Sequence, residues 1–227
     1  MAELRSERVS FSYPGGQRVL CDVTFSLRSG ELVALVGANA GGKTTLLRIL
    51  AGLIKPRQGD VSVDGASIGE ARDRVGLLFQ NPDHQMIAAT VEEEIALGLE
   101  LRAVPSAPMR EIVEILLSRF DLKSLRHRSP ETLSGGQKQR VALAAIMVSR
   151  PSFLLLDEPD SFLDASSRRE FLSGITEVRA ECGILWAVPR PSRMPKADRC
   201  LVLDAGSVRE VARADLANAL ISVRGCE

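Results

Sequence analysis

The chain has 227 residues, of which 45% are hydrophobic and 26% charged. This composition is that of a folded globular protein and excludes an intrinsically disordered one. Its 29 basic and 29 acidic side chains cancel to a formal net charge of +0, so the basic surplus of a dedicated nucleic-acid-binding protein is missing.

The spacing of the cysteines and the length of the apolar runs indicate the compartment in which the chain is expected to work. The four cysteines form no CxxC pair and no metal-ligand spacing, and we expect reduced thiols. The first residues carry charges without a following apolar stretch, so no secretory signal is expected. The apolar runs are far shorter than the roughly 18 to 20 residues of a membrane span. Any role at a membrane is therefore expected to require a partner.

The first part of the chain has the pattern of strands. Residues 9–13 and 23–27 alternate between apolar and polar side chains, which predicts two half-exposed antiparallel strands joined by a Pro-Gly-Gly turn. Residues 32–36 are continuously apolar, as expected of a strand buried on both faces of a parallel sheet. Three similar runs occur at residues 153–156, 184–188 and 200–203.

The middle of the chain is predicted to be helical. Thr90 and Glu93 have the spacing of a capping box, which predicts that a helix begins there. Residues 111–121 place their apolar side chains on one helical stripe. Pro105 and Pro108 are expected to separate these two helices. Residues from about 84 to 132 are therefore predicted to form a helical lobe inserted into an α/β core.

A phosphate-binding loop follows the first buried strand. Residues 37–44 match the pattern GxxxxGK[ST] and precede a helical pattern at 45–51. Small residues allow backbone amides to surround a phosphate, and the helix N-terminus adds its positive end. A glycine-rich turn with a surface lysine is the alternative, and the complete match with correct flanks disfavours it. Lys43 is expected to reach the β- and γ-phosphates of ATP, and the Thr44 hydroxyl to ligate Mg²⁺. The predicted nucleotide-binding residues are Gly37, Asn39, Ala40, Gly41, Gly42, Lys43, Thr44 and Thr45.

Two carboxylates end a later apolar run. Asp157 and Glu158 directly follow residues 153–156, and ligands gather at the carboxyl ends of parallel strands. We therefore expect the pair to face the phosphate loop, with Asp157 holding Mg²⁺ directly or through water and Glu158 polarising the attacking water. Taken alone, the pair would be better interpreted as a solvated strand end. The phosphate loop makes the catalytic interpretation the stronger one.

A capped helix start carries the most specific motif. Ser134 and Gln137 form a second capping box, and the two glycines between them leave first-turn amides uncovered, which suits an anion. A well-capped helix would explain these features by itself. However, Leu-Ser-Gly-Gly-Gln followed by a basic residue is the signature sequence of ABC (ATP-binding cassette) ATPases, and the chain resembles this family over nearly its whole length.

The resemblance implies an α/β fold: a P-loop NTPase RecA-like core with an N-terminal antiparallel β-subdomain and an inserted α-helical signature subdomain. Residues 1–227 would form a single ABC ATPase domain. Within it, residues 1–83 and 150–227 would form the β-subdomain and core, and residues from about 84 to 149 the helical subdomain with the signature helix. Residues 205–227 are expected to allow one short helix.

The family also implies roles for residues outside these motifs. Tyr13 resembles the aromatic residue that stacks on adenine, and Gln80 the glutamine that touches Mg²⁺ or water and senses the membrane subunit. Residues 161–164 resemble the D-loop, with Asp164 as its aspartate. For each residue alone, a structural role is the alternative. The family implies a head-to-tail homo- or heterodimer with a second ABC ATPase subunit, in which each ATP lies between one phosphate loop and the partner's signature residues Ser134, Gly135, Gly136 and Gln137.

One stretch indicates the kind of transporter. Residues 78–85 and 90–98 closely resemble the energy-coupling factor importers, which take up vitamins or metal ions such as cobalt and nickel in prokaryotes. The resemblance implies a transmembrane coupling subunit docking near Gln80–Gly98, a separate substrate-binding membrane subunit, and a peripheral location on the cytoplasmic face of the membrane. Glu92–Glu94 are left open as either a solvated helix start or docking residues. ABC ATPases of DNA repair are disfavoured because no coiled coil or zinc insertion is visible, and no nucleic-acid partner is expected.

Two positions depart from the family. Ala40 stands where transporter loops commonly carry glycine, and alanine is strained there only if φ is positive. Pro189 aligns with the switch histidine that contacts the γ-phosphate, and proline offers no such donor. We therefore expect ATP binding with weak turnover at this chain's own phosphate loop. Two functions remain open: the ATPase motor of an importer, and a hydrolysis-impaired nucleotide-binding half of a heterodimer.

Overall fold

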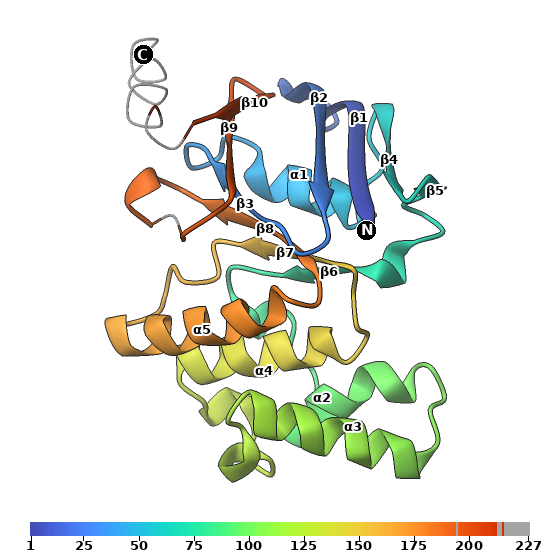
Figure 1. Cartoon of the computed structure of the whole chain (residues 1–227), viewed down its shortest axis with the longest axis vertical. Helices are drawn as coiled ribbons and strands as arrows, with labels where there is room; N and C mark the ends of the chain where they lie inside the picture. Colours follow the sequence, from blue (N-terminus) through green and yellow to red (C-terminus); the bar gives the residue numbers. More distant parts are fainter. Residues whose placement is uncertain (194, 213–214, 216–227) are drawn as a thin grey trace. The chain divides into compact units, whose positions relative to one another are not determined.

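The computed structural model describes residues 1–193, 195–212 and 215, and Figure 1 shows its elements. The chain divides into two compact units. The first unit contains Met1–Leu77, Ser152–Glu158 and the described residues from Glu181 onward, and the second contains Leu78–Pro151 and Pro159–Ala180. The subdomain boundaries predicted near residues 84 and 149 remain predictions.

An antiparallel sheet of four strands belongs to the first unit, in the order β2-β1-β4-β5. In β2, the inward side chains of Val23, Phe25 and Leu27 are buried and alternate with more exposed ones, so the period of two predicted for residues 23–27 is confirmed. The alternation predicted for residues 9–13 is wrong, because Ser10 is buried together with its neighbours Val9 and Phe11 in β1. Tyr13 lies just beyond the end of β1. The strands are β1 (Glu3–Ser12), β2 (Arg18–Arg28), β4 (Gln58–Val63) and β5 (Ala66–Ser67).

The second sheet has six strands in the order β10-β9-β3-β8-β7-β6. Every residue of β3, β7 and β8 is buried. This confirms the prediction, made from their continuous apolar runs, that these strands belong to a sheet covered on both faces. Trp186 and Phe153 are its largest fully buried side chains. The strands are β3 (Leu32–Val36), β6 (Val75–Leu78), β7 (Phe153–Asp157), β8 (Gly183–Val188), β9 (Arg199–Asp204) and β10 (Ser207–Val211).

The register of the central strands brings their carboxyl ends to one edge. β8 runs parallel to both β3 and β7. Val36 pairs with Val188, and Asp157 pairs with Ala187 one residue earlier. The residues that follow these three strands therefore start from the same edge, which is where ligands bind in sheets of this kind.

The second unit is helical. It contains α2 (Val91–Glu100), α3 (Ser106–Arg119), α4 (Gly135–Met147) and α5 (Ala165–Val178). Thr90 accepts a hydrogen bond from the Glu93 amide, and the Glu93 carboxylate accepts one from the Thr90 amide, which confirms the predicted capping box. No described helix is both long enough and apolar enough to span a membrane.

Two further local predictions need correction. Pro108 does not separate two helices, because it lies in the first turn of α3, where the amides have no partner within the helix and proline is tolerated. The helix after the phosphate loop, α1 (Lys43–Leu50), begins at Lys43 rather than at residue 45. The short helix expected within residues 205–227 remains a prediction. The described part of this segment contains the strand β10, antiparallel to β9, and residues 216–227 lie outside the described residues.

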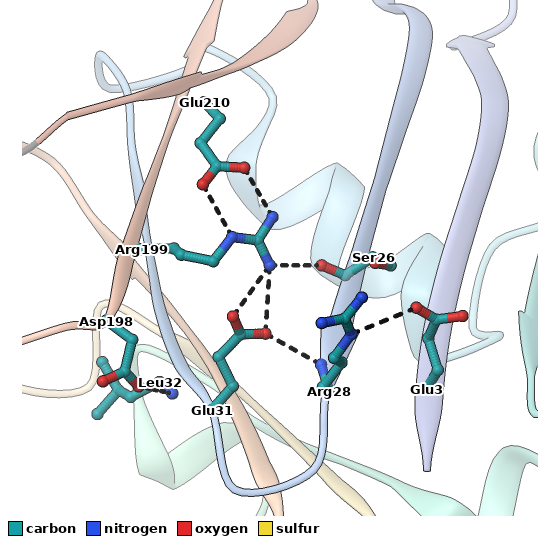
Figure 2. Close-up of polar contacts among 8 residues, drawn as sticks. All are labelled: Glu3, Ser26, Arg28, Glu31, Leu32, Asp198, Arg199 and Glu210. Carbon is teal, nitrogen blue, oxygen red and sulfur yellow. Dashed lines mark hydrogen bonds and ion pairs between the residues drawn. The ribbon is translucent and has the colours of Figure 1, made fainter. Parts of the chain in front are cut away.

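A polar network fastens β9 and β10 to the β2–β3 connection (Figure 2). The Arg199 guanidinium makes two hydrogen bonds of 2.9 and 2.8 Å to Glu210 and two of 3.0 and 3.2 Å to Glu31. It also donates to the carbonyl of Ser26 at 3.2 Å. The hydrogen bonds to Glu210 and Glu31 raise the pKa of Arg199, so its guanidinium stays charged. It therefore holds β9, β10, β2 and the β2–β3 connection together.

Candidate nucleotide-binding site

The phosphate loop connects β3 to α1, and glycine is required at its two ends. A Cβ at Gly37 would lie 2.8 Å from the Leu203 carbonyl oxygen. Gly42 is the N-cap of α1 with φ of 97°, and a Cβ there would lie 3.0 Å from a Val19 methyl. Side chains are therefore excluded where the backbone must turn into the helix. Ala38, Asn39 and Ala40 between them are exposed, which leaves the loop's outer face open.

Lys43 is buried inside this loop. Its side chain is 4% exposed, and Nζ donates to the carbonyls of Gly37 and Ala38, each at 2.9 Å. Nζ also lies 3.1 Å from Oε1 of Glu158. A buried cation at the N-terminus of a helix is electrostatically suited to bind phosphate oxygens. The predicted meeting of Lys43 with the acidic strand end is thus present in the first unit.

The acidic pair ends β7 at the same edge. The Asp157 carboxylate accepts a hydrogen bond from the Thr44 hydroxyl. Burial raises the pKa of Asp157, and the neighbouring Glu158 charge raises it further, while Thr44 and Lys43 oppose the shift. Among the described residues no cluster of three or more His, Cys, Asp or Glu side chains is arranged to hold a metal ion. A hydroxyl and a carboxylate beside a phosphate site nevertheless fit Mg²⁺, which prefers one or two protein oxygens together with substrate phosphates.

Two residues at this site have left-handed backbone conformations. Ala40 has φ of 59° and Glu158 has φ of 47°. Such conformations are costly for residues with a Cβ and persist where the surroundings impose them. At Glu158 the backbone amide donates to the Ala187 carbonyl at 3.2 Å, which turns the chain at the end of β7. Alanine at position 40 is expected to be strained if its φ is positive, and its φ is positive.

Tyr13 is tied to the helix that follows the loop. Its hydroxyl lies 3.1 Å from the Thr45 hydroxyl, and its ring packs edge-on against Phe11 with 5.0 Å between the centroids. Tyr13 is 43% exposed, so part of the residue is accessible to a ligand. The sequence alone gave no signal for the contact with Thr45, because the two residues lie far apart in the chain.

The signature residues begin α4 in the second unit. The Ser134 hydroxyl accepts from the Gln137 amide at 3.3 Å, and Gln137 Oε1 accepts from the Ser134 amide at 2.9 Å, as the capping box predicts. A Cβ at Gly136 would lie 2.6 Å from the Ser167 Cβ. Gly136 therefore allows α4 to approach α5 closely. A Cβ added at Gly135 would have only the Phe162 carbonyl oxygen within 4 Å.

Asp164 and Gln80 also belong to the second unit. The Asp164 carboxylate caps α5 by accepting from the amides of Ser166 and Ser167. The Ser167 amide, followed by that of Ser166, lowers the pKa of Asp164. The backbone carbonyl of Gln80 accepts from Gln139 at 3.1 Å. The structural alternative for Asp164 is thus realised, and the nucleotide roles of Asp164, Gln80 and Ser134–Gln137 remain predictions.

The three glutamates that begin α2 have separate structural roles. Glu93 completes the capping box. Glu92 pairs with Arg126 at 2.6 Å, and this hydrogen bond lowers the pKa of Glu92. Glu94 is only 5% exposed. The interpretation of all three as a solvated helix start is therefore wrong for Glu94.

A groove of about 580 Å³ lies in the second unit. Its walls come from the 83–89 segment and from the turn before α4, and Ile87 in it is 80% exposed. This groove could not be predicted from the sequence, because its two walls are separated by two helices in the chain. Its lining residues are Asp83, Met86, Ile87, Ala88, Ala89, Ser129, Pro130 and Glu131.

Comparison with known proteins gives consistent results. The ABC transporter family matches residues 20–161. The energy-coupling factor transporter ATP-binding protein EcfA1 of Lacticaseibacillus paracasei is 39% identical over 216 residues, covering 92% of this chain and 78% of that protein. The protein of the same description from Symbiobacterium thermophilum is 43% identical over 197 residues, covering 83% and 69%.

Solved structures agree on the fold. The structure of cbiO1 from Clostridium perfringens, described as part of the ABC transporter complex cbiONQ, has a TM-score of 0.84 at 29% identity and covers 97% of this chain and 92% of that one. A dimeric bacterial ABC transporter cassette has a TM-score of 0.82 at 24% identity, with 92% and 98% covered. The predicted P-loop NTPase core, with its antiparallel and helical additions, is confirmed.

Proposed function

This chain belongs to the ABC transporter family, and from that premise we propose that it is the ATP-binding motor subunit of a prokaryotic energy-coupling factor importer. It would use Mg-ATP binding and hydrolysis at a dimer interface to drive uptake of a metal ion or vitamin. The observation that carries the proposal is the buried Lys43 inside the phosphate loop, 3.1 Å from Glu158 at the end of β7.

The residues of the first unit divide the chemistry between them. Lys43 would bind the β- and γ-phosphates, and Glu158 would orient and polarise the attacking water. Thr44 and Asp157 would hold Mg²⁺, which would neutralise phosphate charge when bound. Tyr13, which is 43% exposed, would stack on the adenine. Gln80 and Asp164 would contribute from the second unit.

The partners follow from the same proposal. Ser134–Gln137 would contact the ATP held by a second ABC ATPase subunit, and the groove beside Gln80–Gly98 would receive a transmembrane coupling subunit. A separate membrane subunit would bind the solute, and the chain would lie peripherally on the cytoplasmic face of the membrane. In support, a relative is described as part of an ABC transporter complex.

A second candidate rests on Pro189. This residue follows β8, whose end is paired with the end of β3, and it offers no hydrogen-bond donor. The nearby Arg190 side chain is exposed. A hydrolysis-impaired nucleotide-binding half of a heterodimer would have these features while retaining the loop and Lys43. Turnover would then occur at the site completed by this chain's signature residues on a complete second ATPase.

Nucleotide affinity tests the proposal. Titration with a fluorescent ATP analogue in the presence of Mg²⁺ should give at least about a hundredfold weaker binding for Lys43→Ala, because a buried cation at the phosphates is removed. Lys55→Ala is the matched control, since Lys55 is an exposed lysine soon after the same helix. If Lys43→Ala binds the analogue as tightly as the wild-type chain, the proposed site is wrong.

A further inference from the structure

The signature helix carries two side chains that fix the segment forming one wall of the groove. We propose that Lys138 and Gln139 are positioning residues that fasten Gln80–Ala89 to α4, so that docking of a membrane subunit in the groove is transmitted to Ser134–Gln137. This inference rests on the proposed function, because it assigns a role to that function's docking groove. Neither residue belongs to the predicted nucleotide site.

Gln139 makes the first connection. Its side chain is 2% exposed, and Nε2 donates to the backbone carbonyl of Gln80 at 3.1 Å. Buried polar side chains are costly unless they are hydrogen-bonded. A fully buried amide directed at a loop carbonyl therefore holds that loop in one position relative to the helix.

Lys138 makes the second connection, one residue earlier. Its Nζ lies 2.6 Å from Oδ1 of Asp83, and the Lys138 side chain is only 15% exposed. Asp83 is also a wall residue of the groove. An ion pair with one partly buried member is stronger than a fully exposed one. A partner seated in the groove would thus touch a residue that is fastened to α4.

Glu94 fixes the other end of the same segment. This carboxylate is 5% exposed, and its Oε2 accepts from the amides of Ile87 and Ala88 at 2.9 and 2.8 Å. The segment is therefore held at one end by α4 and at the other by α2. It is a fixed wall rather than a loose loop, and the exposed Ile87 is presented on it.

Lys138 and Gln139 lie close enough to the signature residues along α4 for a movement of the groove wall to reach them. Lys138 and Gln139 directly follow the signature residues Ser134–Gln137 within the first two turns of the helix. A helix of this length moves as a rigid element because each turn is hydrogen-bonded to the next. A shift of the groove wall is therefore a shift of the helix N-terminus that is proposed to face ATP.

The first test uses hydrogen exchange with Mg-ATP as the probe, on the chain together with the ABC ATPase subunit that copurifies with it, because Ser134–Gln137 are proposed to contact the ATP held by that second subunit. In the wild type, nucleotide should change exchange in both the 134–137 and the 80–89 backbone. In Lys138→Glu and in Gln139→Leu, the nucleotide-induced change in hydrogen exchange at residues 80–89 should be lost. The affinity for nucleotide should stay within about twofold of the wild-type value. If 80–89 still responds in both variants, the signal passes through Gln80 directly and the inference is wrong. It is equally wrong if the wild-type segment gives no response.

The second test uses the membrane complex that copurifies with the tagged chain. Lys138→Glu should lower the ATPase rate of the complex about tenfold, and adding Asp83→Lys should restore it. Lys123→Glu is the control, because it breaks a similarly short ion pair, of 2.7 Å, with Glu114 in the same unit. An unchanged rate in Lys138→Glu, or failed rescue in an intact complex, refutes the inference. If no membrane protein copurifies with the wild type, it is the proposed function that fails.

Discussion

The amide of Gly37 donates a hydrogen bond to the carbonyl of Val188 at 3.4 Å. Val188 is the last residue of β8, so this contact places the first residue after the strand, Pro189, beside the start of the phosphate loop. The resemblance to ABC ATPases predicts a γ-phosphate-binding histidine at this position. A proline here supplies neither a side-chain nor a backbone donor, so the proposed site would lack one stabilising contact for the transferred phosphate.

Restoring that contact should accelerate hydrolysis. Pro189→His is expected to raise the steady-state ATPase rate by at least about tenfold, which corresponds to roughly 1.4 kcal/mol of transition-state stabilisation. Pro189→Ala is the control for loss of the proline ring alone and should leave the rate nearly unchanged. A wild-type rate equal to that of Pro189→His would mean that the missing histidine is unimportant and would favour the motor over the impaired half-subunit.

Glu158 should affect turnover and binding in opposite directions. Glu158→Gln removes the carboxylate that is proposed to polarise the attacking water, so kcat should fall by at least about a hundredfold. The same change removes the carboxylate that pairs with Lys43 at 3.1 Å, which leaves the lysine charge free for phosphate, and ATP should bind at least as tightly as before. Nucleotide titration and single-turnover hydrolysis measure the two effects separately. Glu70→Gln, at an exposed position of the same unit, should change neither, and a retained kcat in Glu158→Gln would contradict the assigned role.

Relief of strain in the phosphate loop should increase stability. Ala40 has φ of 59°, which costs an alanine about 1 to 2 kcal/mol, and glycine adopts this conformation freely at a smaller entropic cost. Ala40→Gly is expected to raise the free energy of unfolding in urea by up to about 1 kcal/mol. Ala38→Gly is the matched control, since Ala38 does not have a positive φ, and it should not stabilise the chain. Equal effects of the two changes would refute the strain at Ala40.

The predictions that succeeded from sequence depend on local chemistry. The two capping boxes, at Thr90 and Ser134, require only neighbours three residues apart. The apolar runs and the phosphate loop are likewise contiguous, and the parallel sheet follows from them. Pro108 was misjudged because proline breaks a helix interior but not its first turn.

What sequence could not predict depends on tertiary contacts. Glu92, Glu93 and Glu94 are identical in kind, and only their neighbours in space decide that one pairs with arginine, one caps the helix and one is buried. The contact of Tyr13 with Thr45 and the groove also join distant segments. These features require the folded chain.

The close approach of α4 and α5 predicts unequal effects at two adjacent glycines. A Cβ at Gly136 would come within 2.6 Å of the Ser167 Cβ, whereas at Gly135 its nearest neighbour is the Phe162 carbonyl at 3.7 Å. Gly136→Ala should therefore lower the free energy of unfolding by about 1 to 3 kcal/mol, and Gly135→Ala should not. Adding Ser167→Gly to Gly136→Ala should recover part of the loss. Equal unfolding curves for the two alanine variants would show that the helices do not pack this closely.

The network around Arg199 predicts how stability depends on pH. The hydrogen bonds from Arg199 hold the pKa of Glu210 below its usual value. A carboxylate with a lowered folded-state pKa stabilises the fold above its unfolded-state pKa, near 4.3, and this contribution is lost as the pH falls through the folded-state value. Glu210→Gln should therefore cost stability at neutral pH and progressively less below about pH 4.

Urea unfolding of both proteins across this pH range measures the difference directly. Because the Glu210 side chain is 53% exposed, solvent screening limits the effect at neutral pH to about 1 kcal/mol or less. Glu100→Gln is the control, since Glu100 is exposed and lies outside the network, and its difference from wild type should stay flat with pH. A Glu210→Gln difference that is constant across the range, or grows as the solution is acidified, would show that the carboxylate charge does not hold β10 to β9.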